Sequence, residues 1–358
     1  MAFEKKYINN ASDILLLSID KLEKENIYND EPVTKSINTA FGKIIEALLI
    51  LSLRASELNN NDKPVWQSDL KAKYVELLKK EIEEAYTMFG LYLKNIFFLD
   101  SHWTIEQIKN YEDLNDELWN PFMSGFLYNS NISRELFDLM YNNYLRALKN
   151  SLDKNNHKNL IKHITFRYLL NGNKENDLFS RLLNGWNRID INEIIVIFWT
   201  NEDQILNKNN PDLINRIIVF WRKLYNNYVN STNFDDNGKS ILSNSIKLMV
   251  FINELDGEKV DWIKLALPYL QFEYNEATFI KELSRLASKD NSVKNLGYIS
   301  DLLIKSPILR YRSEKVISIV ESFFETEDNE LIKLGRKICD KYSKSGIMQF
   351  KDLYERYN

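Results

Sequence analysis

The chain has 358 residues, of which 44% are hydrophobic and 27% charged, and its formal net charge is −4. This composition excludes a disordered chain, and the slight acidity gives no general attraction to nucleic acid or to an anionic membrane. With 10 glycines and 6 prolines, sheets with many tight turns are disfavoured and long helices are favoured. A single hydrophobic core stops growing at roughly 250–300 residues, so we expect two subdomains or an elongated stack.

The first predicted helix lies in the sequence ASDILLLSIDKLEKEN, residues 11–26. Its apolar residues cluster on one side of a helix: Ile14, Leu15, Leu17, Ile19 and Leu22. Ser12, or an asparagine before it, can cap the start of this helix with its side-chain oxygen. The preceding MAFEKKYINN has no apolar segment, so we expect no signal peptide here.

The longest apolar stretch of the chain, from Ile44 to Leu53, lies within SINTAFGKIIEALLILSLRAS, residues 36–56. Three charged side chains interrupt or flank it: Lys43, Glu46 and Arg54. A membrane-spanning helix needs about 20 apolar residues, more than this stretch offers. We therefore predict a core helix, capped by Thr39, in which Gly42 permits the close approach of another helix.

Helical spacing of apolar residues continues through the rest of the chain. A helix is expected from Ser68 to Gly90, and the short apolar segment LYLKNIFFLD (91–100) is assigned to a helix because no partner strand is evident. Further helices are expected near 104–111, 115–127, 132–149, 156–170, 175–185, 191–200, 211–229, 237–256, 258–269, 275–289, 291–305, 313–325, 328–343 and 346–357.

Short polar loops separate these helices, at a rhythm typical of one helical hairpin per roughly 34–47 residues. No strict tetratricopeptide or ankyrin signature is present. The fold class that we predict is all-α, an irregular α-solenoid of stacked helical hairpins that forms a right-handed superhelix of the HEAT or TPR kind. The polar stretch KNSLDKNNHKN, residues 149–159, predicts an N-terminal bundle (1–150) and a C-terminal helical-repeat stack (151–358), the second either separate from the first or continuous with it.

Residues that carry catalytic or metal chemistry are few. The histidines are His102, His157 and His163, and the six-residue interval between the last two places them on different helix faces. Cys339 is the only cysteine, which excludes an internal disulfide and a cysteine-based zinc site and fits a reducing cytoplasm. It lies on the apolar face of a predicted helix, so we expect a buried residue and not a nucleophile. No GxSxG, GxGxxG or Walker motif occurs. We therefore predict no enzyme, no cofactor and no metal.

Two acidic clusters, YEDLNDELW (111–119) and ETEDNE (325–330), do not have EF-hand spacing. Acidic residues favour helix N-termini, so we interpret both clusters as solvated helix starts. The seven tryptophans fall mostly inside apolar periodicity and are expected in the core between helices, although tryptophan also serves as a binding anchor. They are Trp66, Trp103, Trp119, Trp186, Trp199, Trp221 and Trp262.

Basic residues gather in two places. The first group consists of Lys158, Lys162 and Arg167, and the second of Arg310, Arg312 and Lys315. A helical-repeat protein can hold a nucleic-acid backbone in a groove lined by such residues. The net negative charge of the chain nevertheless disfavours nucleic acid as a partner. Nucleic-acid binding is therefore the alternative hypothesis.

Several segments resemble a bacterial helical family that commonly forms the C-terminal part of sirtuin-like anti-phage defence proteins. In chain order they are SINTAFGKIIEALLILSLRAS, FGLYLKNIFFLDSHWTIEQI, WNPFMSGFLYNSNISRELFDLM, LGYISDLLIKS and GRKICDKYSKSG. The resemblance covers about residues 36–346 and consists mainly of helix-packing patterns. Phe126 stands where the family pattern favours tyrosine, and no sirtuin-like NAD-binding segment precedes the helices, so the resemblance implies either an excised C-terminal region or a protein that acts alone.

In such defence proteins the enzymatic domain depletes NAD, and the resemblance implies that the helical part senses a phage component or controls assembly. We therefore predict a non-enzymatic, cytoplasmic sensor or scaffold, the C-terminal sensing region of an anti-phage defence protein. Its expected partner is a protein, either a phage component or a sirtuin-like effector domain. An oligomer is possible, and no membrane is involved. The alternatives are a helical-repeat protein that binds or repairs nucleic acid, and an enzyme whose site is assembled from distant helices.

Overall fold

The computed structural model describes residues 5–22, 31–58, 64–129, 132–150, 152–170, 173–183, 188–208, 210–231, 233–272, 274–311 and 313–357. Within these ranges every regular element is a helix and no strand occurs. The predicted all-α class is therefore confirmed. The helices follow from the apolar spacing, because most of them present one apolar face to a core and one polar face to solvent.

Contacts divide the chain into two compact units, Met1–Leu182 (unit 1) and Leu183–Asn358 (unit 2). The polar stretch near residue 150, where the sequence predicts a boundary, lies inside unit 1. The reason is that α11 (Lys154–Leu169), which follows this stretch, packs against α8 (Asp116–Tyr128) of the same unit.

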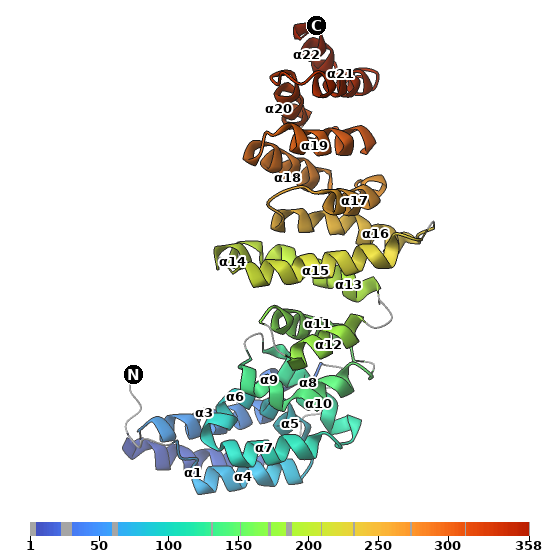
Figure 1. Cartoon of the computed structure of the whole chain (residues 1–358). Coiled ribbons are helices and arrows are strands. Elements are labelled where there is room, and N and C mark those ends of the chain that lie inside the picture. Colours follow the sequence, from blue (N-terminus) through green and yellow to red (C-terminus); the bar gives the residue numbers. More distant parts are fainter. Residues whose placement is uncertain are drawn as a thin grey trace. The chain divides into compact units, whose positions relative to one another are not determined.

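Among its described residues, unit 1 contains ten further helices. They are α1 (Lys5–Lys21), α2 (Pro32–Asn38), α3 (Ala40–Leu58), α4 (Ser68–Lys79), α5 (Glu83–Leu91), α6 (Leu93–Leu99), α7 (Ser101–Tyr111), α9 (Arg134–Leu139), α10 (Tyr141–Ala147) and α12 (Asn173–Leu183), whose last residue crosses the boundary. The most extensive packing joins α5 to α8, which lie side by side (Figure 1). At their crossing, a Cβ atom on Gly90 would lie 2.1 Å from the Phe122 carbonyl oxygen, and one on Gly125 would lie 2.0 Å from that of Thr87.

The apolar stretch of residues 36–56 forms the end of α2 and most of α3, with a bend of 81° between the two helices. The Thr39 hydroxyl accepts the Gly42 amide at 3.1 Å, which confirms the predicted cap. A Cβ atom on Gly42 would lie 1.9 Å from the Ser36 carbonyl oxygen, so the glycine permits close packing of α2. Leu48 is fully buried, as expected of a core helix. In the described part of the chain, no single helix is long and apolar enough to cross a membrane, and only the bent α2–α3 pair would pass on length and composition.

The helix predicted from Ser68 to Gly90 is in fact two helices. It breaks because Glu81 adopts a left-handed conformation with φ 54°. The Ile82 amide then donates to the Leu77 carbonyl at 3.2 Å, which is the hydrogen bond that ends a helix in a Schellman motif. Three other predicted helices are also broken. Residues 132–149 form α9 and α10. Residues 237–256 form α16 (Asp236–Ser245) and the 3-10 helix η1 (Ile246–Phe251), and residues 258–269 form α17 (Gly257–Ala266) and the 3-10 helix η2 (Leu267–Tyr269).

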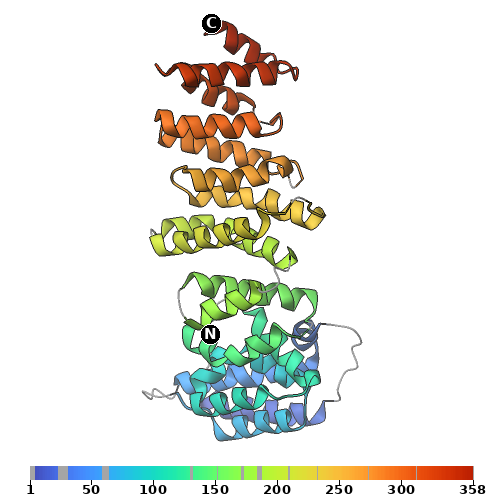
Figure 2. The same cartoon turned by 45° about the vertical axis from the view of Figure 1, so that its right-hand side comes forward.

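Unit 2 begins with α13 (Arg188–Thr200) and ends with α22 (Gln349–Arg356). Between them lie α14 (Glu202–Asn207), α15 (Pro211–Tyr228), α16 (Asp236–Ser245), η1 (Ile246–Phe251), α17 (Gly257–Ala266), η2 (Leu267–Tyr269), α18 (Glu276–Lys289), α19 (Val293–Lys305), α20 (Ser313–Phe324) and α21 (Asn329–Ser343). These helices follow one another in chain order along the unit (Figures 1 and 2). Helix α17 packs on α19 and α19 on α21, while α18 packs on α20 and α20 on α22.

Candidate binding site

The three histidines belong to unit 1 and the cysteine to unit 2. His102 is exposed on α7, whereas His163 is buried and lies 3.0 Å from the Tyr144 hydroxyl through its Nδ1 atom. Cys339 is fully buried on α21, and burial raises the pKa of its thiol to about 12. The raised pKa keeps the thiol protonated at neutral pH. The predicted burial of Cys339 is confirmed. Among the described residues, no group of three or more His, Cys, Asp or Glu side chains is placed to hold a metal ion.

The acidic clusters are helix starts, as predicted. The Asn115 side chain caps α8, and Asp116 and Glu117 occupy its first turn. The Asp328 side chain caps α21 by accepting the Leu331 amide at 2.9 Å. Asp116, Glu117 and Asp328 thus lie at helix N-termini, where the helix dipole favours negative charge.

The two basic groups belong to different units. In unit 1, the Arg167 guanidinium lies 5.1 Å from the centre of the Phe137 ring, and its Nη1 atom donates to the Ile132 carbonyl at 3.4 Å. In unit 2, an Arg310 nitrogen lies 3.5 Å from the Ser345 carbonyl oxygen, and Arg312 lies outside the described residues. Arginines with these contacts tie parts of the fold together.

Most of the tryptophans are core residues. Four are buried, Trp66, Trp119, Trp221 and Trp262. Trp103 and Trp199 are partly exposed, and Trp186 lies outside the described residues. The core role that the apolar periodicity predicts is therefore confirmed for the four buried rings.

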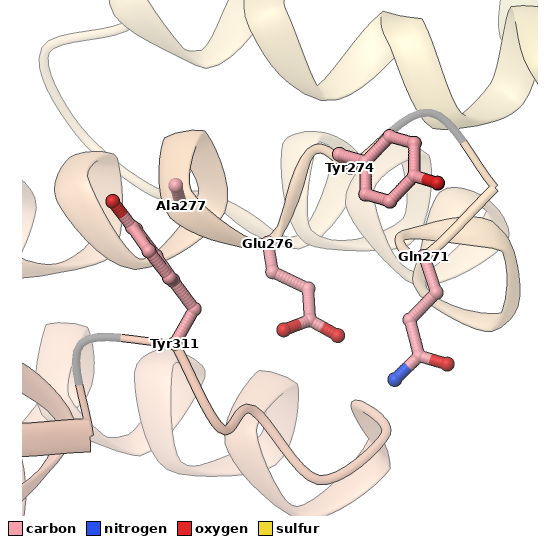
Figure 3. Close-up of a pocket in the computed structure, with 5 residues that line it drawn as sticks. All are labelled: Gln271, Tyr274, Glu276, Ala277 and Tyr311. Atoms are coloured by element: carbon pink, nitrogen blue, oxygen red, sulfur yellow. The ribbon is translucent and has the colours of Figure 1, made fainter.

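Unit 2 contains a pocket of about 590 Å³ lined by Gln271, Tyr274, Glu276, Ala277 and Tyr311. Gln271 and Tyr274 lie in the turn between η2 and α18, Glu276 and Ala277 begin α18, and Tyr311 lies in the loop between α19 and α20. The Glu276 carboxylate lies between the Tyr311 ring on one side and Gln271 and Tyr274 on the other (Figure 3). The pocket thus combines aromatic surface with one carboxylate and one amide.

The turn before α18 positions the pocket. Tyr274 has a φ of 53°, and the Asn275 amide donates to the Leu270 carbonyl at 3.0 Å. The Asn275 side chain is buried and donates to the Ser243 hydroxyl at 2.9 Å. This buried anchor fixes the turn, while the Tyr274 side chain remains 91% exposed.

Sequence reasoning did not identify this pocket. The signal was the segment QFEYNE, in which two aromatic residues stand in a polar stretch directly before a helix start. The opposite wall of the pocket, Tyr311, lies 35 residues beyond the end of this segment. Only the packing of α18 on α20 brings the two segments together.

A second exposed apolar surface lies on unit 1, between α1 and α3. It is a groove of about 530 Å³ lined by Ala11, Ile14, Leu15, Ala47, Ile50, Leu51 and Arg54. Ile14 is 64% exposed and Leu17, on the same helix, is 61% exposed. Ile8 and Ile19 of α1 are buried, so this helix carries apolar residues toward the core and toward solvent.

Comparison with the known protein families finds no match, and neither the curated proteins nor the solved structures contain a match to this chain. The site must therefore be interpreted from its own geometry.

Proposed function

We propose that this chain is a non-enzymatic helical scaffold that binds a protein partner. The observation that carries the proposal is the apolar groove between α1 and α3. A helix at the surface of a monomeric protein normally has one apolar face, and α1 has large aliphatic side chains on its solvent side as well. A contiguous exposed apolar surface of this kind is typical of an interaction site.

We also propose that unit 2 is a helical-repeat stack of the solenoid type. Its support is a set of contacts between residues separated by similar distances along the chain. Arg285 reaches the Met249 and Ile252 carbonyls at separations of 36 and 33 residues. Lys341 reaches carbonyls 35 to 38 residues earlier. Recurrence at one spacing indicates structural repeats that each contact the next, and such stacks present long surfaces to partners.

The resemblance to the helical region of sirtuin-like defence proteins remains a prediction. It identifies the partners to test first, namely phage structural proteins and a sirtuin-like effector domain. Its implied sensing role is compatible with a scaffold that has no catalytic site of its own.

The test uses the full chain as bait in cells before and during phage infection, followed by reconstitution of each captured complex from purified components. The Ile14→Glu/Leu17→Glu double variant places one charge in the groove, at Ile14, and one on the exposed apolar surface of the same helix, and is expected to lose the partner. Val293 of α19 is also exposed, at 49%, so Val293→Glu is a matched control that should retain it. Failure to reconstitute any complex, or equal binding by the double variant, would contradict the proposal.

A further inference from the structure

We infer that the pocket lined by Tyr274, Glu276 and Tyr311 accepts an arginine side chain from an extended segment of the protein partner. The inference rests on the proposed scaffold function and specifies the chemistry that the partner must present. It concerns unit 2 only and is independent of the groove on α1 and α3.

The first argument is the exposure of the aromatic side chains. Tyr274 is 91% exposed and Tyr311 is 55% exposed. Phe272, three residues before Asn275, is 41% exposed, and the Lys239 ammonium lies 6.0 Å from the centre of its ring. The face of an aromatic ring attracts a cation, and here one aromatic residue beside the pocket already has a cation over it.

The second argument is the backbone conformation of Tyr274. A left-handed residue at the end of a helical turn is usually glycine, because a Cβ atom is disfavoured there. For a bulky residue this conformation is an outlier. Since Tyr274 is almost fully exposed, burial does not compensate for the strain. A strained backbone conformation that no burial of the side chain offsets is typical of functional positions.

The third argument is charge. Among the lining residues in the described ranges, Glu276 is the one charged side chain, and it stands in the first turn of α18. It forms no ion pair with a described residue. Its carboxylate therefore favours a cationic ligand and disfavours phosphate or an anionic lipid surface.

Arginine fits this set of groups better than lysine. Its planar guanidinium can stack on a tyrosine ring and donate two parallel hydrogen bonds to a carboxylate such as that of Glu276. The Gln271 side-chain oxygen can accept a further N–H group. A pocket of about 590 Å³ has room for the whole side chain together with part of the peptide that carries it.

The test measures binding of the peptide acetyl-Gly-Ser-Arg-Ser-Gly-amide to the full chain by NMR titration. The control peptide replaces arginine with citrulline, which keeps the shape and removes the charge. We expect the arginine peptide to bind in a saturable manner and the citrulline peptide at least tenfold more weakly. Glu276→Gln and Tyr274→Gly should each weaken arginine binding at least fivefold.

Glu81→Gly is the matched control for Tyr274→Gly. Glu81 has almost the same backbone conformation, with φ 54°, but belongs to unit 1 and lines no part of this pocket. Both glycine variants should raise the melting temperature of their unit, and only Tyr274→Gly should lose the peptide. A loss of binding together with a gain in stability cannot come from unfolding.

Equal binding of the arginine and citrulline peptides, or no binding of either, would overturn the inference. Binding that survives in both Tyr274→Gly and Glu276→Gln would overturn it as well. In each of these cases a reconstituted complex that depends on Ile14 and Leu17 would still support the scaffold function. The two proposals therefore fail separately.

Discussion

The two units differ in how closely their helices approach at glycine. At the crossing of α5 and α8 in unit 1, a Cβ atom on Gly125 would lie 2.0 Å from the Thr87 carbonyl oxygen. In α19 of unit 2, a Cβ atom on Gly297 would meet no neighbouring heavy atom within 4 Å. In unit 2, long cationic side chains instead link one helix to the end of an earlier one. Lys341 donates to the carbonyls that end α19, and Arg285 to carbonyls at the end of η1. The α5–α8 crossing of unit 1 thus depends on the absence of a side chain, and these links of unit 2 depend on the presence of particular ones.

This difference has consequences for mutation. Backbone contact at a glycine tolerates no added atom, because protein interiors are close-packed and the opposing carbonyl group cannot move alone. A hydrogen bond from a flexible lysine to a helix end can be replaced by water when the site is partly exposed. Substitutions in unit 1 should therefore have larger effects than substitutions of the linking residues in unit 2.

The largest effect is expected for Leu48→Asp in α3, which places an unpaired charge at a position with no solvent exposure. We expect the free energy of unfolding of unit 1 to fall by about 4 kcal/mol or more. Hydrogen exchange followed by mass spectrometry should show loss of protection in α3, α5 and α6, with α17 to α21 unchanged. Simultaneous loss of protection in both units would show that they do not unfold separately, and an unchanged melting temperature would contradict the core position of α3.

The next effect is expected for Gly125→Ala in α8. The added methyl group overlaps the Thr87 carbonyl, so α5 and α8 must separate, at a cost of about 3 kcal/mol. Gly297→Ala in α19 is the matched control. Its methyl group meets no atom, and alanine is favoured over glycine in a helix by about 0.5–1 kcal/mol. Urea denaturation should therefore show opposite signs for the two variants, and equal effects would remove the distinction between the units.

Sequence patterns predicted the existence of nearly all helices, because amphipathic spacing reports which residues face a core. They did not predict the breaks. Glu81 takes up a left-handed conformation without the glycine that usually marks such a position. Gly90 shows the converse, a glycine whose role is not to end a helix. Helix α5 does end one residue later, at Leu91, but the glycine permits the close approach of the Phe122 carbonyl.

The candidate pocket was beyond sequence reasoning for a different reason. Exposure and backbone strain at Tyr274 are properties of the folded chain, and its partner Tyr311 is brought near by helix packing. By contrast, the burial of Cys339 follows from its place on the apolar face of α21. Local periodicity thus determines what is buried, whereas a site built from two loops depends on how the helices stack.

Acid should also distinguish the two units, since all three histidines belong to unit 1. Burial lowers the pKa of His163 to about 4, compared with about 6.5 in an unfolded chain. Below pH 6.5 the unfolded chain therefore binds a proton that the folded chain does not, and stability falls as the pH drops from about 6.5 to about 4. The predicted loss is about 3 kcal/mol, and it is absent above pH 6.5.

Replacement of this histidine by His163→Gln should flatten the dependence of unfolding free energy on pH in that window. His102→Gln is the control for the loss of an imidazole, because the His102 side chain is 87% exposed and not part of the core. An unaltered slope in His163→Gln would show that another group is responsible for the acid sensitivity of unit 1.

The smallest of these effects is expected for Lys341→Met in unit 2. The Lys341 ammonium donates to the Leu303 carbonyl at 3.0 Å, to the Ile304 carbonyl at 2.9 Å and to that of Ser306. Methionine keeps the aliphatic stem but leaves these carbonyls to water, which should cost about 2 kcal/mol because the site is half-buried.

Lys333→Met on the same helix is the control. The Lys333 side chain is 77% exposed beside Glu330, so its loss should cost less than about 0.5 kcal/mol. Equal losses of unfolding free energy in the two variants, measured by urea denaturation, would show that the Lys341 hydrogen bonds do not stabilise unit 2. Its helices would then be held together by apolar contacts alone, and would differ from the glycine crossing of unit 1 only in how closely they pack.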